Sequence, residues 1–375
     1  MPDHLLTLNA GSSSIKFALF ESAGGLTTPV VSGQVEGLGD GLGEGPGALT
    51  HAQALAQVLA RIGKARVVAV GHRIVHGGLR FDAPVLIDAA VLAALEALQD
   101  LAPLHQPHNI AGVKAARAAF AGVPQVACFD TAFHRTQPEV NRHFALPQAL
   151  HDAGIQRYGF HGLSYESIRD QLLAADAQAA RRRVVVAHLG NGASMCAMHE
   201  GKSVATTMSF SPLDGLPMGT RCGRLVAAAV LHLLLPGGRS REEVTRLLYR
   251  ESGLLGLSGI SSDMRELLAS PAPRAKLAVD YFVEQAAREL AAMAAALRGI
   301  ETLVFTGGIG ENAHTLRARI VNDAAWMGLR LDAQGNASGA SRISAADSTV
   351  SIHVLRTNEE AVIARQSARC AGVLT

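Results

Sequence analysis

The chain has 375 residues, of which 48% are hydrophobic and 18% are charged, so it can bury one large core or two ordinary ones. This composition excludes a protein that is mainly disordered. The formal net charge is only +2, from 34 basic and 32 acidic residues, which gives no field that would favour nucleic acid or an anionic membrane surface. We therefore expect small-molecule partners, with no nucleic acid and no membrane among them.

Cysteine usage and the apolar segments indicate the compartment. The four cysteines, Cys128, Cys196, Cys222 and Cys370, lie far apart with no C-x-x-C spacing, so they predict neither a disulfide framework nor a zinc finger. The first residues contain no basic segment followed by a cleavable apolar stretch. The apolar run 226–235 is much shorter than the ~20 residues of a membrane-spanning helix. We expect a cytoplasmic protein.

In chain order, the first half predicts a strand, a tight turn and a second strand over 5–20, followed by a glycine-rich flexible loop over 37–47. Apolar patterns then predict a strand over 67–70, helices over 87–98 and 110–120, and a strand over 125–129. The second half repeats the strand, turn and strand over 183–201, and continues with helices over 225–235 and 277–297, a strand over 303–305 and a helix over 313–321. This alternation indicates α/β layers.

The two strand–turn–strand segments share one pattern about half a chain apart. Superposing Asn9 on His188 also superposes Gly11 on Gly190 and Ser14 on Ala193. A repeat of this length indicates a duplicated domain rather than a solenoid, whose periods are about 20 to 50 residues. We expect the two loops to face one another across a cleft.

Three loops rich in glycine or hydroxyl groups follow strands, where backbone N–H groups can converge on phosphate oxygens. They are 9–14, with Lys16 two residues later, then 188–192, and finally 306–312 at the start of a helix. Taken alone, each loop has a simpler explanation: a serine-rich turn, a hairpin turn, or a helix entry that needs close packing. Their combination favours a bound nucleotide.

Nine short motifs occur in order along almost the whole chain. They are NAGSSSIK (9–16), GHRIVHGG (71–78), LAPLH (101–105), FDTAFH (129–134), YGFHG (158–162), HLGNG (188–192), MGTRCG (218–223), GIGEN (308–312) and TNEE (357–360). In this combination the chain resembles the acetate kinases, the acetokinase family of the acetate and sugar kinase, Hsp70 and actin superfamily. The resemblance implies an α/β fold of two duplicated actin-like ATPase (ribonuclease H-like) domains around an active-site cleft. We assign residues 1–134 and the C-terminal helix 361–375 to the first domain and residues 135–360 to the second, nucleotide-binding domain.

The implied reaction is the reversible transfer of the γ-phosphoryl group of ATP to acetate, giving acetyl phosphate and ADP, with Mg²⁺ or possible Mn²⁺ as cofactor and a homodimer as the assembly. A carboxylate with a pKa near ~4.5 is already ionised at neutral pH, so this nucleophile needs no general base. It needs cations that hold two anions in line.

The resemblance assigns the catalytic residues. Arg73 binds the acetate carboxylate and then the transferred group, and Arg221 binds the equatorial oxygens of the phosphoryl group in the transition state. His161 donates a hydrogen bond to that group, and Asp130 orients Arg73 or Mg²⁺. From the residues alone, Arg73 could equally be a surface arginine and Arg221 a helix-entry residue.

The resemblance also implies the binding residues. Asn9 and Glu359 lie on the metal side, through bound waters. The substrate pocket consists of Arg73, Val75, Leu104, His105, Phe160 and Pro212. A valine at position 75 should make propionate a poorer substrate, because one methylene is worth only ~1 to 3 kcal/mol in such a pocket. The nucleotide-binding residues are Ser12, Ser14, Lys16, His188, Leu189, Gly190, Asn191, Gly192, Asp263, Met264, Arg265, Gly308, Ile309, Gly310, Glu311 and Asn312.

One segment departs from the family pattern. After Gly223 the chain reads Arg224-Leu225-Val226-Ala227, where the family has a helix-entry aspartate and proline. Their loss predicts a looser loop around Arg221. Three alternatives follow: a kinase for propionate or another short-chain acid, a nucleotide-binding protein with weakened catalysis, and an actin-like filament or chaperone ATPase.

Overall fold

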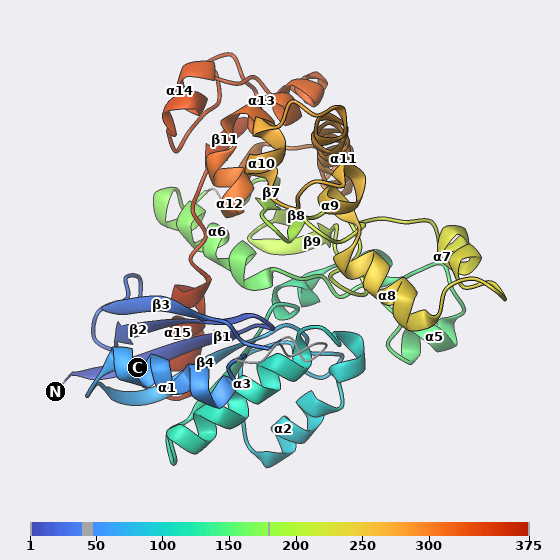
Figure 1. Cartoon of the computed structure of the whole chain (residues 1–375). Coiled ribbons are helices and arrows are strands. Elements are labelled where there is room, and N and C mark those ends of the chain that lie inside the picture. The colour runs from blue at the N-terminus through green and yellow to red at the C-terminus, as the bar shows by residue number, and fades with distance from the viewer. Residues whose placement is uncertain (1, 40–47, 179–180, 374–375) are drawn as a thin grey trace. The chain divides into compact units, whose positions relative to one another are not determined.

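The structure, a computed structural model, describes residues 2–39, 48–178 and 181–373. The chain forms two compact units, shown in Figure 1. Unit 1 consists of Met1–Arg135, Gly162–Ser167 and Asn358–Thr375, and unit 2 of Thr136–His161 and Ile168–Thr357. The domain boundaries after residues 134 and 360 stay a prediction.

Unit 1 is built on a six-stranded sheet in the order β3-β2-β1-β4-β6-β5. The strands are β1 (Asp3–Ala10), β2 (Ser14–Glu21), β3 (Val31–Glu36), β4 (Arg66–Ile74), β5 (Val85–Leu86) and β6 (Gln125–Phe129). Strands β1, β2 and β3 form an antiparallel meander, while β4 and β6 extend the sheet parallel to β1. The parallel strands therefore bring their carboxyl ends to one edge of the sheet.

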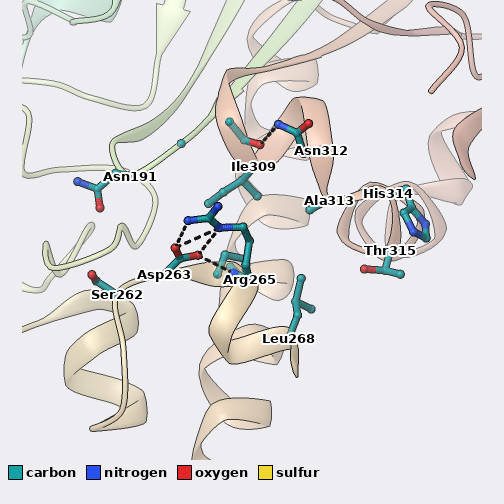
Figure 2. Close-up of a pocket in the computed structure, with 13 residues that line it drawn as sticks. Asn191, Ser262, Asp263, Arg265, Leu268, Ile309, Asn312, Ala313, His314 and Thr315 are labelled. Carbon is teal, nitrogen blue, oxygen red and sulfur yellow. Dashed lines mark hydrogen bonds and ion pairs between the residues drawn. The ribbon is translucent and has the colours of Figure 1, made fainter. Parts of the chain in front are cut away.

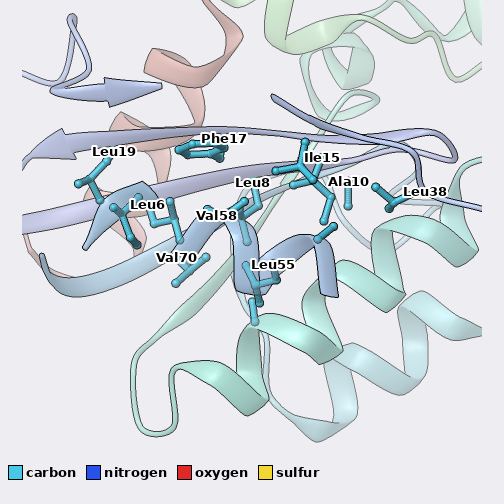
Figure 3. Close-up of a cluster of buried hydrophobic side chains, with 14 residues drawn as sticks. Leu6, Leu8, Ala10, Ile15, Phe17, Leu19, Leu38, Leu55, Val58 and Val70 are labelled. Carbon is cyan, nitrogen blue, oxygen red and sulfur yellow. The ribbon is translucent and has the colours of Figure 1, made fainter. Parts of the chain in front are cut away.

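Helices of unit 1 pack against this sheet. They are α1 (His51–Ile62), α2 (Ala89–Glu96), α3 (Gln106–Ala119) and α15 (Glu359–Cys370), with short 3₁₀ turns at Gln99–Leu101 and Ala132–Thr136. Helix α1 begins with a capping box in which Thr50 and Gln53 satisfy each other's backbone N–H groups. Figure 3 shows Leu55 and Val58 of α1 packed against Leu8 and Val70 of the sheet. Helix α15, red in Figure 1, contacts β1, β4 and β6.

Unit 2 repeats the arrangement of unit 1. Its five-stranded sheet has the order β11-β10-β7-β8-β9, with β7 (Val184–Leu189), β8 (Ala193–His199), β9 (Lys202–Thr206), β10 (Thr302–Thr306) and β11 (Ser351–Val354). Strands β7 to β9 are an antiparallel meander, and β10 and β11 run parallel to β7. In each sheet the first strand therefore has the antiparallel meander on one side and two parallel strands on the other. The first sheet has one further strand, β5, which pairs antiparallel with β6 at its edge. The predicted α/β fold with a duplicated sheet is confirmed.

The remaining helices belong mainly to unit 2. They are α4 (Glu139–Arg142), α5 (Gln148–Asp152), α6 (Gly162–Ala175), α7 (Ala227–Leu233), α8 (Arg241–Arg250), α9 (Gly253–Ser258), α10 (Met264–Ala269), α11 (Pro273–Ala296), α12 (Gly307–Asn312), α13 (His314–Asp323) and α14 (Ala333–Ser338), with a 3₁₀ turn at Ala325–Met327. The long helix α11 contacts β7, β8 and β9 and is the main support of the second sheet. No helix in the described ranges is both long and apolar enough to cross a membrane.

Two elements differ from the prediction made from the sequence. The helix expected over 110–120 begins at Gln106, because Pro107 suits a first helical turn whose N–H groups have no helical partner. Residues 307–312, expected as part of a loop, form helix α12 instead. The Glu311 carboxylate accepts the Gly307 N–H at 3.0 Å, which caps a glycine-rich turn that has low helix propensity. Residues 40–47 of the predicted glycine-rich loop lie outside the described residues.

Candidate active site

The carboxyl ends of the parallel strands in unit 1 gather an arginine and a carboxylate. Arg73 lies near the end of β4 and Asp130 directly follows β6. The Arg73 Nε donates to Asp130 Oδ1 at 2.9 Å and its Nη2 to Oδ2 at 2.6 Å, a two-point ion pair. The Asp130 side chain is only 2% exposed and that of Arg73 20%. One edge of the guanidinium is therefore fixed by the protein.

Two further side-chain oxygens lie near the same guanidinium and face it as acceptors. Glu359 Oε2 lies 3.9 Å from Arg73 Nε, and Asn9 Oδ1 accepts from Arg73 Nη1 at 3.5 Å. Burial alone would lower the pKa of Arg73, but Asp130 and Glu359 raise it well above its usual range. Burial raises the pKa of the Glu359 carboxyl, an effect that Arg73 opposes and Asp130 reinforces. Negative charge is thus undercompensated around Arg73.

This excess fits a hard cation. The available metal ligands are carboxylate and amide oxygens, which Mg²⁺ prefers. Within the described part of the chain, no three His, Cys, Asp or Glu residues converge as a complete metal site. An ion beside Asn9 and Glu359 would therefore keep several water ligands, as Mg²⁺ commonly does.

Two buried polar residues on α3 support the segment after Arg73, and sequence reasoning missed both. Asn109 accepts the Val75 N–H at 2.9 Å and donates to the Ala10 carbonyl at 2.7 Å, so it joins the ends of β1 and β4. Gln106 accepts the His76 N–H at 3.3 Å and donates to the His76 carbonyl at 3.2 Å. The sequence did contain a signal for both, since they are polar residues on the otherwise apolar buried face of α3.

The other predicted residues of unit 1 surround this edge of the sheet. Val75 is 4% exposed, while Leu104 and His105 are partly buried just before α3. Ser12 belongs to the turn between β1 and β2, and Ser14 is the first residue of β2; the Gly11 N–H closes the turn on the Ser14 carbonyl at 2.9 Å. Lys16 is exposed on β2, opposite Asn9 in the ladder.

In unit 2, two histidines lie together at the start of α6 and the end of β7. The rings of His161 and His188 stack at a centroid distance of 4.3 Å. The His161 Nδ1 lies 2.8 Å from the Ser194 hydroxyl, and Ser194 is fully buried. His161 adopts a left-handed backbone with φ of 59°, which costs a non-glycine residue about 1 to 2 kcal/mol. Such strain is typical of functional sites and here aims a ring that is fixed at one nitrogen.

Arg221 and His161 both approach the turn at Gly192. A methyl group at Gly192 would lie 2.7 Å from Arg221 Nη2 and 3.3 Å from His161 Nε2, so only glycine lets both side chains approach the turn after β7. The Arg221 Nη1 donates to the Pro212 carbonyl at 2.6 Å. Pro212 is buried and Phe160 is 1% exposed. Unit 2 thus presents two imidazoles and a guanidinium beside a glycine turn.

A cavity of about 940 Å³ lies next to this turn, within the range of small-molecule and cofactor sites. It is lined by Gly190 and Asn191, by 262–265 with Leu268, and by Gly308, Ile309 and 312–315. In Figure 2 the Arg265 side chain folds back over Asp263. This ion pair, with Nε to Oδ2 at 3.1 Å, lowers the pKa of Asp263 mainly by hydrogen bonding.

Of the sixteen residues predicted to bind nucleotide, eight line this cavity: Gly190, Asn191, Asp263, Met264, Arg265, Gly308, Ile309 and Asn312. Five more belong to neighbouring parts of unit 2: His188 and Leu189 to the end of β7, Gly192 to the turn after it, and Gly310 and Glu311 to α12; the other three belong to unit 1. Sequence reasoning missed Ser262, Leu268 and the first residues of α13, His314 and Thr315. The last two lie just after the predicted loop 306–312, and this position was the one indication in the sequence that they could line the cavity.

A buried arginine holds the helix that forms one wall of the cavity. Arg317 is 2% exposed and donates to the Gly310 and Glu311 carbonyls at 2.8 and 2.9 Å, and to Asn336 Oδ1 at 2.8 Å. In the described ranges no carboxylate forms an ion pair with it, and burial lowers its pKa. It therefore contributes a buried positive charge beneath α12.

Comparison with known proteins identifies relatives along the whole chain. Residues 4–365 match the family model described as the Acetokinase family. The chain is 50% identical over 394 residues to an acetate kinase of Rhodopseudomonas palustris, with 99% of both chains covered. A propionate kinase from Francisella tularensis superposes with a TM-score of 0.90 at 37% identity, covering 98% of this chain and 99% of that one. An acetate kinase of Porphyromonas gingivalis gives a TM-score of 0.87 at 34% identity, with the same coverage.

Proposed function

Because the chain belongs to the acetokinase family, we propose that it catalyses the reversible transfer of the γ-phosphoryl group of ATP to acetate. An acetate oxygen forms the new bond to phosphorus while the bond to the β–γ bridging oxygen breaks, which gives acetyl phosphate and ADP. The observation that carries the proposal is the ion pair of Arg73 with Asp130, which presents a fixed guanidinium at the edge of the first sheet.

Charge compensation, not proton transfer, is the task of this site. Acetate is ionised at neutral pH and needs no base. Arg73 binds the carboxylate, and Asp130 fixes the orientation of Arg73 through its two-point contact. Asp130 is thus a positioning residue rather than a general base.

Arg221 and His161 act on the phosphoryl group. Arginine at the equatorial oxygens of a metaphosphate-like transition state is worth ~10³ to 10⁵ in rate. The contact of Arg221 with the Pro212 carbonyl and the hydrogen bond of His161 to Ser194 support these roles, because both side chains are oriented before substrate binds.

Asn9 and Glu359 would hold Mg²⁺, or Mn²⁺ in its place, through oxygen ligands and waters. When bound, the ion supplies positive charge that neutralises the phosphate oxygens. Lys16, with Ser12 and Ser14 on the turn before it, contributes to phosphate binding. The cavity of unit 2 binds the nucleotide, with Asp263, Met264 and Arg265 near the adenosine and Gly308 to Asn312 near the α-phosphate and ribose.

The decisive assay traps acetyl phosphate with hydroxylamine in a reaction of ATP, Mg²⁺ and acetate. Acetate-dependent hydroxamate and stoichiometric ADP are expected. If ATP bound but no hydroxamate formed, the protein would be a nucleotide-binding relative without this chemistry. Hydrolysis of ATP that does not depend on acetate would instead indicate a filament or chaperone ATPase.

Propionate is the second candidate acceptor, favoured by the likeness to the propionate kinase of Francisella tularensis. Val75, Leu104, His105, Phe160 and Pro212 would form the pocket for the acyl chain. Because Val75 is buried and held by Asn109, we expect acetate to be preferred. Acetate and propionate competing at equal concentration give the ratio of their kcat/KM values, and a ratio below one would reverse the assignment.

We further propose a cytoplasmic homodimer, with 1–134 plus 361–375 and 135–360 as the domains of each chain. The homodimer is supported by an apolar surface around α7. In this surface five side chains are 41% to 69% exposed, and no residue of α7 is buried; the five are Leu225, Val226, Leu231, Leu234 and Leu235. Such a surface is costly in a monomer. Light scattering should give twice the chain mass for the native protein and the chain mass for Leu231→Glu.

A further inference from the structure

The loop that carries Arg221 ends at Arg224. Its backbone is closed by two hydrogen bonds, from the Arg224 N–H to the Gly215 carbonyl at 2.8 Å and from the Met218 N–H to the Arg221 carbonyl at 3.0 Å. Arg224 thus lies at the base of the loop, three residues beyond Arg221. The backbone position of Arg221 therefore depends on the position of this base.

The Arg224 side chain fastens this base to helix α11. Its Nη1 lies 2.9 Å from Glu289 Oε1 and its Nη2 3.4 Å from Oε2, a two-point contact between partners 65 residues apart. The Glu289 side chain is only 5% exposed, whereas that of Arg224 is 63% exposed. The arginine therefore covers a carboxylate that is built into the core side of α11.

The environment of Glu289 makes it a specific anchor for a cation. Burial raises the pKa of Glu289, Arg224 opposes this shift, Asp214 adds to it and Arg157 opposes it more weakly. A buried carboxylate without a partner is unfavourable, so Glu289 draws Arg224 to one position. Helix α11 also contacts β7 and β8, the strands that carry the turn with Gly192.

The chain on the other side of Arg224 offers no comparable anchor. Helix α7 starts at Ala227, its N-cap residue Val226 makes no side-chain capping bond, and none of its residues is buried. The loop is further attached to α8, through the Cys222 N–H to the Leu248 carbonyl at 3.1 Å and the Thr220 hydroxyl to the Tyr249 carbonyl at 2.9 Å. It is also attached to the turn after β7, through the Gly219 N–H to the Asn191 carbonyl at 3.2 Å, and to α9, whose Leu254 and Leu255 N–H groups donate to the Met218 and Gly219 carbonyls. These attachments hold the middle of the loop, and Arg224 adds a side-chain ion pair from the loop base to α11.

Resting on the proposed function, we infer that the Arg224–Glu289 ion pair positions Arg221 for phosphoryl transfer. Arg224 belongs to the segment for which the sequence predicted a looser loop, and it attaches the base of that loop to α11. Arg224 touches no reacting group in this role and is a positioning residue. Its removal should affect the transition state more than the binding of either substrate.

The test compares Arg224→Met, Glu289→Gln and the double variant with native protein. Each single change should lower kcat by tenfold or more, while KM for acetate and Kd for ADP change less than twofold. The double variant should lose no more than the worse single variant, because both changes break one link. Arg224→Lys, which keeps the charge, should recover part of the rate. Arg246→Met is the matched control, since Arg246 forms an ion pair with Glu251 and is equally exposed, and it should leave kcat unchanged.

Hydrogen–deuterium exchange of 215–224 gives a readout that does not need activity. Exchange in this segment should rise in Arg224→Met and Glu289→Gln but not in Arg246→Met, with α13 unchanged in all three. Unchanged exchange overturns the inference whatever the activity is. An active native protein whose kcat is insensitive to Arg224→Met also overturns it, whereas an inactive native protein with the expected exchange pattern contradicts the proposed function and leaves the attachment standing.

Discussion

Replacing Asp130 by asparagine is the most direct test of the carboxylate-binding half of the site. Asp130 accepts from Arg73 at 2.6, 2.9 and 3.2 Å and is almost completely buried. Asparagine keeps the shape and one acceptor, but it places an NH₂ group against Arg73 and removes the negative charge. Breaking a buried charge pair from one side costs about 3 to 5 kcal/mol, and the retained acceptor reduces this to about 3 to 4 kcal/mol.

If most of that energy orients Arg73, kcat/KM for acetate should fall by about 10² to 10³, since ~1.4 kcal/mol corresponds to a factor of ten. Steady-state formation of acetyl phosphate at varied acetate gives the number, and calorimetry with ADP checks that nucleotide binding stays within twofold. Asp88→Asn is the control, because Asp88 caps α2 and asparagine caps equally well. A decrease of less than threefold in Asp130→Asn, with Arg73→Ala still strongly impaired, would show that Arg73 is oriented without Asp130.

Three further outcomes follow from the structure. Arg73→Ala should raise KM for acetate as well as lower kcat, whereas Arg221→Ala should mainly lower kcat, and equal effects of both on acetate affinity alone would contradict this division of roles. Arg317→Met removes the donors to α12 and should destabilise the protein by about 3 kcal/mol in urea unfolding and weaken ADP binding at least tenfold, with KM for acetate unchanged. Burial lowers the pKa of His72 from 6.5 to about 4, so the unfolded chain binds the extra proton first and stability is lost as the pH falls from 6.5 to 4. In His72→Asn the fall in unfolding free energy over this range should be shallower by about 1.4 kcal/mol per pH unit, and an unchanged slope would contradict the assignment.

The local sequence pattern was sufficient to predict strands and helices whose apolar residues form a regular run along the chain. The hairpins at 5–20 and 183–201 have apolar runs on both sides of a small-residue turn, and both exist as β1–β2 and β7–β8. Their equivalence also predicted the duplication, because the two sheets share one strand order. Helix α12 was not predictable in this way, since its glycines favour a loop and its capping contacts come from Glu311 and Arg317.

The side-chain pairs of the site lie beyond the reach of local pattern. Arg73 and Asp130 are 57 residues apart and meet only because β4 and β6 are parallel neighbours. A pattern could place each residue at the end of a strand, but not predict that the two ends share an edge. Asn109 and Arg317 were missed for a related reason: each satisfies backbone groups that the sequence leaves unassigned until the chain has folded.

Burial and partners, rather than residue type, decide what each arginine of this chain does. Arg73 is held by the carboxylates of Asp130 and Glu359, so its position is fixed and its charge is largely offset within the protein. Arg317 is buried among carbonyl and amide groups, so it stabilises α12 and leaves a net positive charge beside the cavity. Arg224 is exposed but faces a buried glutamate, so its energetic importance comes from the partner it covers. A near-neutral composition is therefore compatible with a local excess of positive charge at Arg317, because the carboxylates that offset Arg73 and Arg224 are placed beside those arginines.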